Sequence, residues 1–131
     1  INSRRIANCH YIYDNISDVN CITLQNDANH TFFWLPILLN LDKMRTSIST
    51  VREWLLNHGV QTRYRYYRTM QYQPAYIDYI TENYPDYEPS ATPRAQYVCE
   101  RIIGLPARAD LTQEEIDHII YIIHQMEEYF A

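Results

Sequence analysis

An apolar run of ten residues, HTFFWLPILL at positions 30–39, most constrains what this chain can fold into. Its aromatic and aliphatic residues are bounded by polar ones, a pattern typical of a buried strand. Because Pro36 has no N–H to donate to a neighbouring strand, we expect this strand to lie at a sheet edge or to carry a bulge there. A buried strand needs a cover, which the rest of the chain must supply.

Apolar residues at spacings of three and four predict that cover as helices. The spacing occurs in residues 3–16 (Ile6, Cys9, Tyr13, Ile16), in residues 42–58 (Met44, Ile48, Val51, Leu55) and in residues 93–102 (Ala95, Val98, Cys99, Ile102). Gly59 and Gly104 are the expected stops of the second and third helices, and Thr92-Pro93 is the expected start of the third. A capping box, TQEE at 112–115, predicts a last helix with the apolar residues Ile116, Ile119, Ile120, Ile123 and Met126.

The remaining segments predict extended and irregular chain. Residues 60–67 form a second extended segment in which Arg63, Arg65 and Tyr67 share one face. Residues 72–93 are rich in proline, so we expect a long irregular connection with one short helical turn near 75–80 and a brief strand from Leu105. The order of elements predicts an α+β fold in two layers over residues 1–131: a small, mainly antiparallel sheet of about three strands covered by helices.

Composition limits the function classes. A formal net charge of −5 and a pI near 5.4 argue against a nucleic-acid-binding surface. No apolar stretch approaches the roughly 20 residues of a membrane span, and no glycine-rich phosphate loop is present. The five histidines lack ligand spacing, so we expect no metal site. Three scattered cysteines, Cys9, Cys21 and Cys99, predict reduced thiols in or near the core.

One segment stands out in this acidic chain: QTRYRYYRTMQYQPAY, residues 61–76, which contains three arginines, five tyrosines and no carboxylate. Its arginines could be solvated or paired with carboxylates of residues 78–117, while its tyrosines cover the core edge. They could equally bind a phosphate or carboxylate, with tyrosines stacking on a sugar or pyridine ring. Binding of single-stranded RNA is opposed by the overall charge.

The succession NHGVQTRYRYY (57–67), QYQPAY (71–76) and PRAQYVCERIIGLPARADLTQEEIDHII (93–120) resembles the C-terminal part of the DegT/DnrJ/StrS sugar aminotransferases. These are pyridoxal-phosphate enzymes of aspartate aminotransferase fold type I. The order and spacing match over residues 42–123, and residues 1–20 look like the end of the family's interdomain helix. The resemblance implies that the chain is the small C-terminal domain of a longer enzyme and packs against an N-terminal cofactor domain missing from this sequence.

The resemblance also implies an activity: transfer of an amino group, usually from glutamate, to a keto sugar carried on a nucleotide. It implies a cytoplasmic homodimer of amino-sugar or polysaccharide biosynthesis. The residues that it places near substrate or cofactor are Thr62, Arg63, Arg65, Tyr66, Gln73 and Tyr76. The family often has histidine at the position of Arg65, a departure that bears on substrate identity more than on fold.

Pyridoxal phosphate is expected in the full-length enzyme and not in this chain alone. Transamination needs a lysine that forms a Schiff base, and the family's lysine lies upstream in the large domain. The only lysine here, Lys43, is far from the matching segments, and we expect it to be a surface charge. The alternative is a stand-alone, non-catalytic binding or interaction domain that kept the fold without the cofactor domain.

Overall fold

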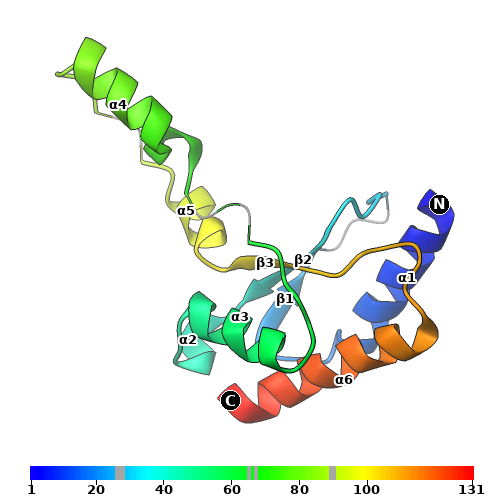
Figure 1. Ribbon diagram of the computed structural model, residues 1–131. Coiled ribbons are helices and arrows are strands. Elements are labelled where there is room, and N and C mark those ends of the chain that lie inside the picture. The colour runs from blue at the N-terminus through cyan, green and yellow to red at the C-terminus, as the bar shows by residue number, and fades with distance from the viewer. Residues whose placement is uncertain (26–28, 65, 67, 89–90) are drawn as a thin grey trace.

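The computed structural model of the chain describes residues 1–25, 29–64, 66, 68–88 and 91–131. These residues form three strands, β1 (Ile22–Leu24), β2 (Leu35–Leu39) and β3 (Ile102–Leu105), in one antiparallel sheet of order β1-β2-β3 (Figure 1). The predicted α+β fold with a small antiparallel sheet is confirmed. The apolar run contributes only its second half to β2, and the three-residue β1 is too short to give a period in the sequence.

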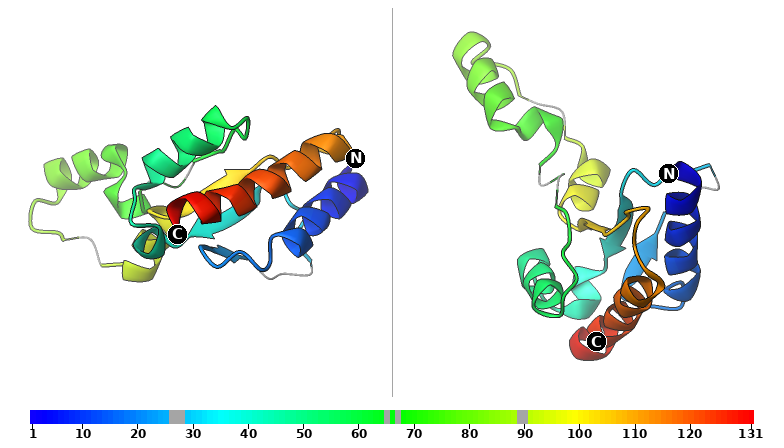
Figure 2. Two further views of the ribbon diagram at one scale, coloured as in Figure 1. Left: turned by 90° about the horizontal axis from the view of Figure 1, so that it is seen from below. Right: turned by 45° about the vertical axis from the view of Figure 1, so that its right-hand side comes forward.

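Helices cover one face of the sheet. The long helices α1 (Asn2–Asn15), α3 (Ile48–Asn57) and α6 (Gln113–Phe130) pack on the same side, and α6 crosses in front of the sheet between the other two in the left view of Figure 2. The strand residues that face them are almost fully buried: Ile22, Leu35, Ile37, Leu39, Ile103 and Leu105. The opposite face carries Thr23, Leu38 and Ile102, which stay exposed or half-buried. The core therefore lies between a single sheet and a single helical layer.

The sequence locates two of these helices well. The residues predicted to face the core from α1 are buried, except Ile6, which packs partly buried against it. At the start of α6, the Thr112 hydroxyl accepts a hydrogen bond from the Glu115 N–H, and the Glu115 carboxylate accepts one from the Thr112 N–H. This reciprocal pair confirms the predicted capping box. Gly59 adopts φ 82°, the left-handed conformation expected where α3 stops.

The prediction that Pro36 marks an edge or a bulge is wrong, because β2 is the central strand. Along β2, the N–H of Leu39 points to β3 and that of Asn40 to β1, so alternation places Pro36 toward β1. The ladder between β1 and β2 ends at the pair of Leu24 with Ile37, so it does not reach the neighbouring Pro36. The missing N–H therefore faces a position where no strand is left to receive it.

Tyr13 of α1 occupies that position. Its hydroxyl donates to the carbonyl oxygen of Pro36 and is hydrogen-bonded to the backbone of Gln25. The side chain is buried, and this burial raises the pKa of Tyr13 well above its ordinary value. One phenol thus continues the contact between two strands beyond the end of their ladder.

Replacing Tyr13 by phenylalanine should lower the free energy of unfolding by about 2 kcal/mol, because the buried Pro36 carbonyl and the Gln25 backbone would lose their partner. Urea unfolding followed by circular dichroism measures the difference. Tyr11→Phe, on the exposed side of the same helix, is the control and should cost less than about 0.5 kcal/mol. Equal losses for the two variants would contradict the bridging role of Tyr13.

The helix predicted over residues 42–58 is two helices, α2 (Leu41–Met44) and α3. Arg45 between them adopts φ 50°, which ends α2. Ser47 then starts α3, because its hydroxyl accepts a hydrogen bond from the Thr50 N–H. The apolar spacing continues across the break, so it concealed the local capping.

The helix predicted over residues 93–102 is also wrong at its end. The helix α5 (Pro93–Cys99) stops early, and Ile102 and Gly104 lie in β3, where pairing with β2 prevails over the helical spacing. Residues 72–93 hold more helix than the short turn predicted near 75–80, because the ten-residue helix α4 (Pro74–Asn83) lies there. It is preceded by a 3-10 turn, η1 (Met70–Tyr72).

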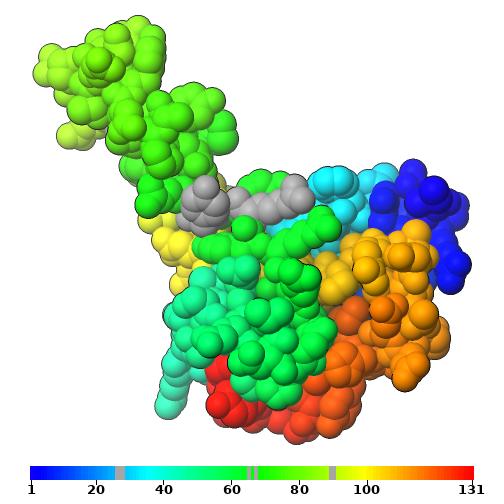
Figure 3. Space-filling view, viewed as in Figure 1, coloured from blue at the N-terminus to red at the C-terminus, as the bar shows by residue number. Residues whose placement is uncertain are grey.

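The helices α4 and α5 project from the body of the molecule (Figure 3). None of their residues is buried, so the apolar residues of α5, including Val98, do not face the core. The exposed tyrosines of this projection are Tyr72, Tyr76, Tyr79, Tyr84, Tyr87 and Tyr97. Isolated helices of this length are marginal in water, so this projection should be the least protected part of the chain.

The cysteines are reduced, as predicted: Cys9 and Cys21 are buried and Cys99 is half-buried. Lys43 is exposed, and its Nζ donates to the carbonyl oxygen of Asn20 at 3.3 Å. In the part of the chain that the structure describes, no helix is long and apolar enough to cross a membrane. The same residues include no cluster of three or more His, Cys, Asp or Glu side chains that could hold a metal ion.

Candidate functional site

The chain that follows α3 places Arg63 at the edge of the sheet. Arg63 and Gly104 exchange two backbone hydrogen bonds of 2.8 Å, forming an antiparallel bridge beside β3. The predicted extended segment is therefore present at Arg63. Arg65 and Tyr67 lie outside the described residues, so the predicted role of Arg65 and the face that it would share with Arg63 stay predictions.

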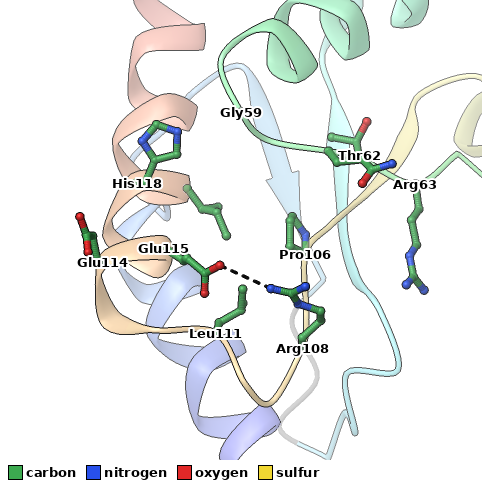
Figure 4. A pocket seen from close by; sticks show the side chains of 11 residues that line it. Gly59, Thr62, Arg63, Pro106, Arg108, Leu111, Glu114, Glu115 and His118 are labelled. Atoms are coloured by element: carbon green, nitrogen blue, oxygen red, sulfur yellow. Dashed lines mark hydrogen bonds and ion pairs between the residues drawn. The ribbon is translucent and has the colours of Figure 1, made fainter.

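A pocket of about 650 Å³ opens between the chain after α3 and the start of α6, and we call it the large pocket (Figure 4). Its lining residues are Gly59, Gln61, Thr62, Arg63, Pro106, Arg108, Leu111, Glu114, Glu115, His118 and Ile119. Figure 4 shows Arg108 and Glu115 pointing toward each other, with Nη2 and Oε1 3.5 Å apart. The Arg63 side chain points away from His118 and Glu114.

Arg63 also lines a second hollow of about 210 Å³, which we call the small hollow. Its other lining residues are Ile1, Arg5, Phe33, Trp34, Leu105, Ala107, Arg108 and Ala109. These described lining residues include three arginines, two aromatic rings and no carboxylate. The small hollow is therefore suited to an anion that carries a flat or apolar group.

The three arginines of the small hollow differ in how they are held. Arg108 has two carboxylate partners, Asp110 at 3.4 Å and Glu115 at 3.5 Å. Arg5 donates to the carbonyl oxygen of Thr31 and to the side-chain oxygen of Asn2. The exposed guanidinium of Arg63 makes no hydrogen bond or ion pair with any residue that the structure describes. The described carboxylates of residues 78–117 therefore form no ion pair with Arg63.

Two other predicted site residues lie near Arg63. The Thr62 side chain is 9% exposed and lines the large pocket, and its hydroxyl oxygen accepts a weak hydrogen bond of 3.4 Å from Arg52 Nε. The hydroxyl proton of Thr62 remains available for a ligand. The exposed Tyr66 ring packs edge-on against Trp34, with ring centroids 5.4 Å apart.

The remaining predicted residues, Gln73 and Tyr76, are not brought to this site. Gln73 precedes α4 and donates to the carbonyl oxygen of Arg68 at 3.1 Å, while Tyr76 is exposed on α4 itself. Neither residue lines the large pocket or the small hollow. Their contact with substrate stays a prediction.

Reasoning from the sequence missed Arg5, Trp34 and Arg108. They come from α1, from the chain before β2 and from the loop before α6, and only the folded chain brings them to Arg63. No local spacing connects residues so far apart. The absence of carboxylates within residues 61–76 was the one available signal, and Arg63 is the only residue of the small hollow that lies in this segment.

The described residues do not fit attachment of pyridoxal phosphate. The cofactor of an aminotransferase is held by a lysine Schiff base beside a phosphate cradle. Lys43, the only lysine of the sequence, lies on α2 and lines neither the large pocket nor the small hollow. Any such lysine would have to come from chain outside these residues.

Several solved structures share the fold of this chain. An aminotransferase, TlmJ from Streptoalloteichus hindustanus, matches with a TM-score of 0.78 and 16% identity over 99% of this chain and 32% of its own. Helicobacter pylori PseC, an aminotransferase of pseudoaminic acid biosynthesis, matches with 0.78 and 17% identity over 98% of this chain and 33% of its own. DesV from S. venezuelae matches with 0.78 and 19% identity over 97% and 32%.

These identities are low, so the structural matches establish the fold alone. This chain spans about a third of the length of the solved relatives. A search of curated proteins found no match. The family assignment comes from the sequence itself, because residues 1–124 match the model of one family. The chain belongs to the DegT/DnrJ/EryC1/StrS aminotransferase family.

Proposed function

We propose that this chain is the C-terminal domain of a pyridoxal-phosphate-dependent aminotransferase that transfers an amino group from glutamate to a nucleotide-linked keto sugar. Membership of the family and the span of about a third of the solved relatives support this assignment. One of these relatives, NtdA from Bacillus subtilis, is described with bound cofactor PMP. In the full-length protein, a cytoplasmic homodimer of polysaccharide or amino-sugar biosynthesis, α1 would end the interdomain helix.

The observation that carries this proposal is the exposed guanidinium of Arg63, which has no hydrogen bond or ion pair with the residues that the structure describes. Arg63 lines both the large pocket, to which Thr62 also contributes, and the small hollow, whose Trp34 packs against Tyr66. In an acidic chain, a cation without a carboxylate partner is free to bind an anionic ligand. The nucleotide sugar and the carboxylate of glutamate both supply such a group.

The role of this chain is then binding and orientation. Arg63 holds the anionic part of a substrate, Thr62 can donate its hydroxyl proton, and Tyr66 with Trp34 forms an apolar wall. The cofactor supplies the electron sink of amino transfer when it is bound. No step of that transfer is assigned to a residue of this chain, since its lysine is not at the site.

The test is Arg63→Gln in the full-length enzyme, assayed for 2-oxoglutarate formation from glutamate with a panel of nucleotide-linked keto sugars. Loss of a charge-assisted contact should raise the KM of the sugar substrate about tenfold with little change in kcat. Arg94→Gln, an exposed arginine on α5, is the matched control and should leave both values unchanged.

The two KM values separate the possible ligands of Arg63. A rise in the KM of the keto sugar alone assigns Arg63 to that substrate, whereas a rise in the KM of glutamate assigns it to the co-substrate carboxylate. Unchanged kinetics for both substrates would remove Arg63 from the site. Absence of amino transfer to every keto sugar in the panel by the unmodified enzyme would contradict the proposed function itself.

A further inference from the structure

Trp34 rests directly on the backbone of Gly104. A Cβ atom built on Gly104 would lie 2.4 Å from Cε3 and 3.1 Å from Cζ3 of the indole. Such a close approach is possible only because Gly104 has no side chain. The indole ring therefore occupies the space above β3 that a side chain would otherwise fill.

The same glycine holds Arg63. The backbone of Gly104 exchanges both of its hydrogen bonds with Arg63, so the indole and the arginine are fixed to a single residue of β3. Tyr66 packs edge-on against the indole from the chain that continues beyond Arg63. Both Trp34 and Arg63 line the small hollow. The position of Arg63 relative to this hollow is thus tied to the position of Trp34.

The charges of the small hollow are unevenly balanced. Arg108 is neutralised by Asp110 and Glu115, whereas Arg5 and Arg63 have no carboxylate partner among the described residues. Arg5 comes from α1 and Arg63 from the chain beside β3, so the two cations approach the hollow from different elements. Two arginines beside an aromatic wall suit a phosphate group, which accepts bidentate hydrogen bonds on several oxygens.

We propose that the small hollow is a binding subsite for a phosphate or diphosphate group, in which Arg5 and Arg63 bind the anion and Trp34 is the positioning residue of Arg63. The proposal rests on the proposed function, since it assigns the phosphate of the substrate to Arg63 together with Arg5, and gives Trp34 a role that the sequence did not indicate. Trp34 acts through its seat on Gly104 and does not itself contact the phosphate.

Binding of inorganic pyrophosphate to the full-length protein tests the subsite. Calorimetric titrations are made with pyridoxal phosphate in excess, so that the phosphate site of the cofactor is already filled. Arg63→Gln and Trp34→Ala should each weaken pyrophosphate binding about tenfold, and the double variant should be weakened less than twofold further, because both changes act through one guanidinium. Arg5→Gln should weaken binding independently of Trp34→Ala.

Two conservative variants serve as controls. Trp34→Phe keeps a ring over Gly104 and should retain binding within about threefold, and it also keeps the test open if Trp34→Ala does not fold. Trp54→Phe changes the other tryptophan, which stacks on His58 and Tyr129 away from the hollow, and should leave pyrophosphate affinity unchanged.

Three outcomes would overturn the subsite: additive effects of Arg63→Gln and Trp34→Ala, unchanged affinity in Trp34→Ala, or pyrophosphate binding that does not depend on Arg5 and Arg63. Each is separable from failure of the proposed function. Amino transfer to a keto sugar without coupling between Trp34 and Arg63 would leave the function standing and remove the subsite. Coupled pyrophosphate binding in a protein that aminates no keto sugar would do the reverse.

Discussion

Alanine at position 104 should lower the free energy of unfolding by about 3 kcal/mol, the upper range for an overpacked site. The added methyl group would stand 2.4 Å from the indole of Trp34, well inside van der Waals contact. Gly104 lies in β3 between Pro36 of β2 and the bridged Arg63, so its backbone cannot move aside without loosening both pairs. Urea unfolding monitored by circular dichroism gives the loss directly.

Two further variants separate this clash from ordinary costs of replacing glycine. Gly59→Ala introduces strain at φ 82° and should cost about 1 kcal/mol, with a Cβ that meets His118 at 3.3 Å. The double variant Trp34→Ala with Gly104→Ala should be less destabilised than the sum of the two single variants. The reason is that Trp34→Ala removes the indole ring with which the methyl group of Ala at position 104 would clash. A loss below about 0.5 kcal/mol in Gly104→Ala would mean that the indole is not seated on β3.

The elements that the sequence predicted well are those whose signals are local. The capping box of α6 and the stripe of α1 depend on residues within a few positions of each other, and both are confirmed. Where the apolar spacing continued past the end of an element, it predicted helices that are too long. It continued through Arg45 between α2 and α3, and from α5 into β3, where a strand partner decided the conformation.

The misplacement of Pro36 has a different cause. Proline is expected in an edge strand because it has no N–H to donate to a neighbouring strand. Only the strand on the side of that missing N–H is affected, so a central strand can hold a proline where its neighbour on that side has ended. Because the ladder with β1 ends at Ile37, no strand lies opposite the missing N–H of Pro36, and the central strand tolerates the proline. The Tyr13 hydroxyl donates a hydrogen bond to the carbonyl oxygen of Pro36 at this position. The residues near Pro36 in the sequence do not indicate that the Tyr13 hydroxyl of α1 contacts it, because Tyr13 is 23 residues away.

The candidate site divides in the same way. Thr62, Arg63 and Tyr66 are close in sequence: Thr62 lines the large pocket, Arg63 lines both the large pocket and the small hollow, and Tyr66 packs against Trp34 of the small hollow. The residues that give this region its charge and its wall, Arg5 and Trp34, come from other elements. A site assembled across the fold from three segments leaves no period or spacing in the sequence, and so only its central segment could be predicted.

The stability of the chain should fall steeply in alkali, from about pH 9 upward, because two buried thiols are kept neutral by the fold. Burial raises the pKa of Cys9 from 9.0 to about 11, against an opposing effect of the Arg5 charge. Burial, with the Glu127 charge, raises the pKa of Cys21 from 9.0 to about 11 as well. Below pH 9 both thiols are protonated in the folded and unfolded chain, so their contribution is complete and independent of pH.

Above pH 9 the unfolded chain releases these protons first, so it binds fewer protons than the folded chain and stability declines until about pH 11. A shift of this size amounts to about 2 to 3 kcal/mol for each thiol, or about 5 kcal/mol for the pair. Urea unfolding at half-unit steps from pH 8 to 11 measures the slope.

Replacement of both buried thiols, in Cys9→Ala with Cys21→Ala, should flatten the stability profile most clearly between pH 9 and 10, where the buried Tyr13 contributes less than it does above its ordinary pKa of 10.0. Cys99→Ala is the control and should change the slope less, since that thiol is half-buried. If the double variant keeps the steep decline of the unmodified chain over this interval, the thiols are ionised in the folded state and the decline has another origin.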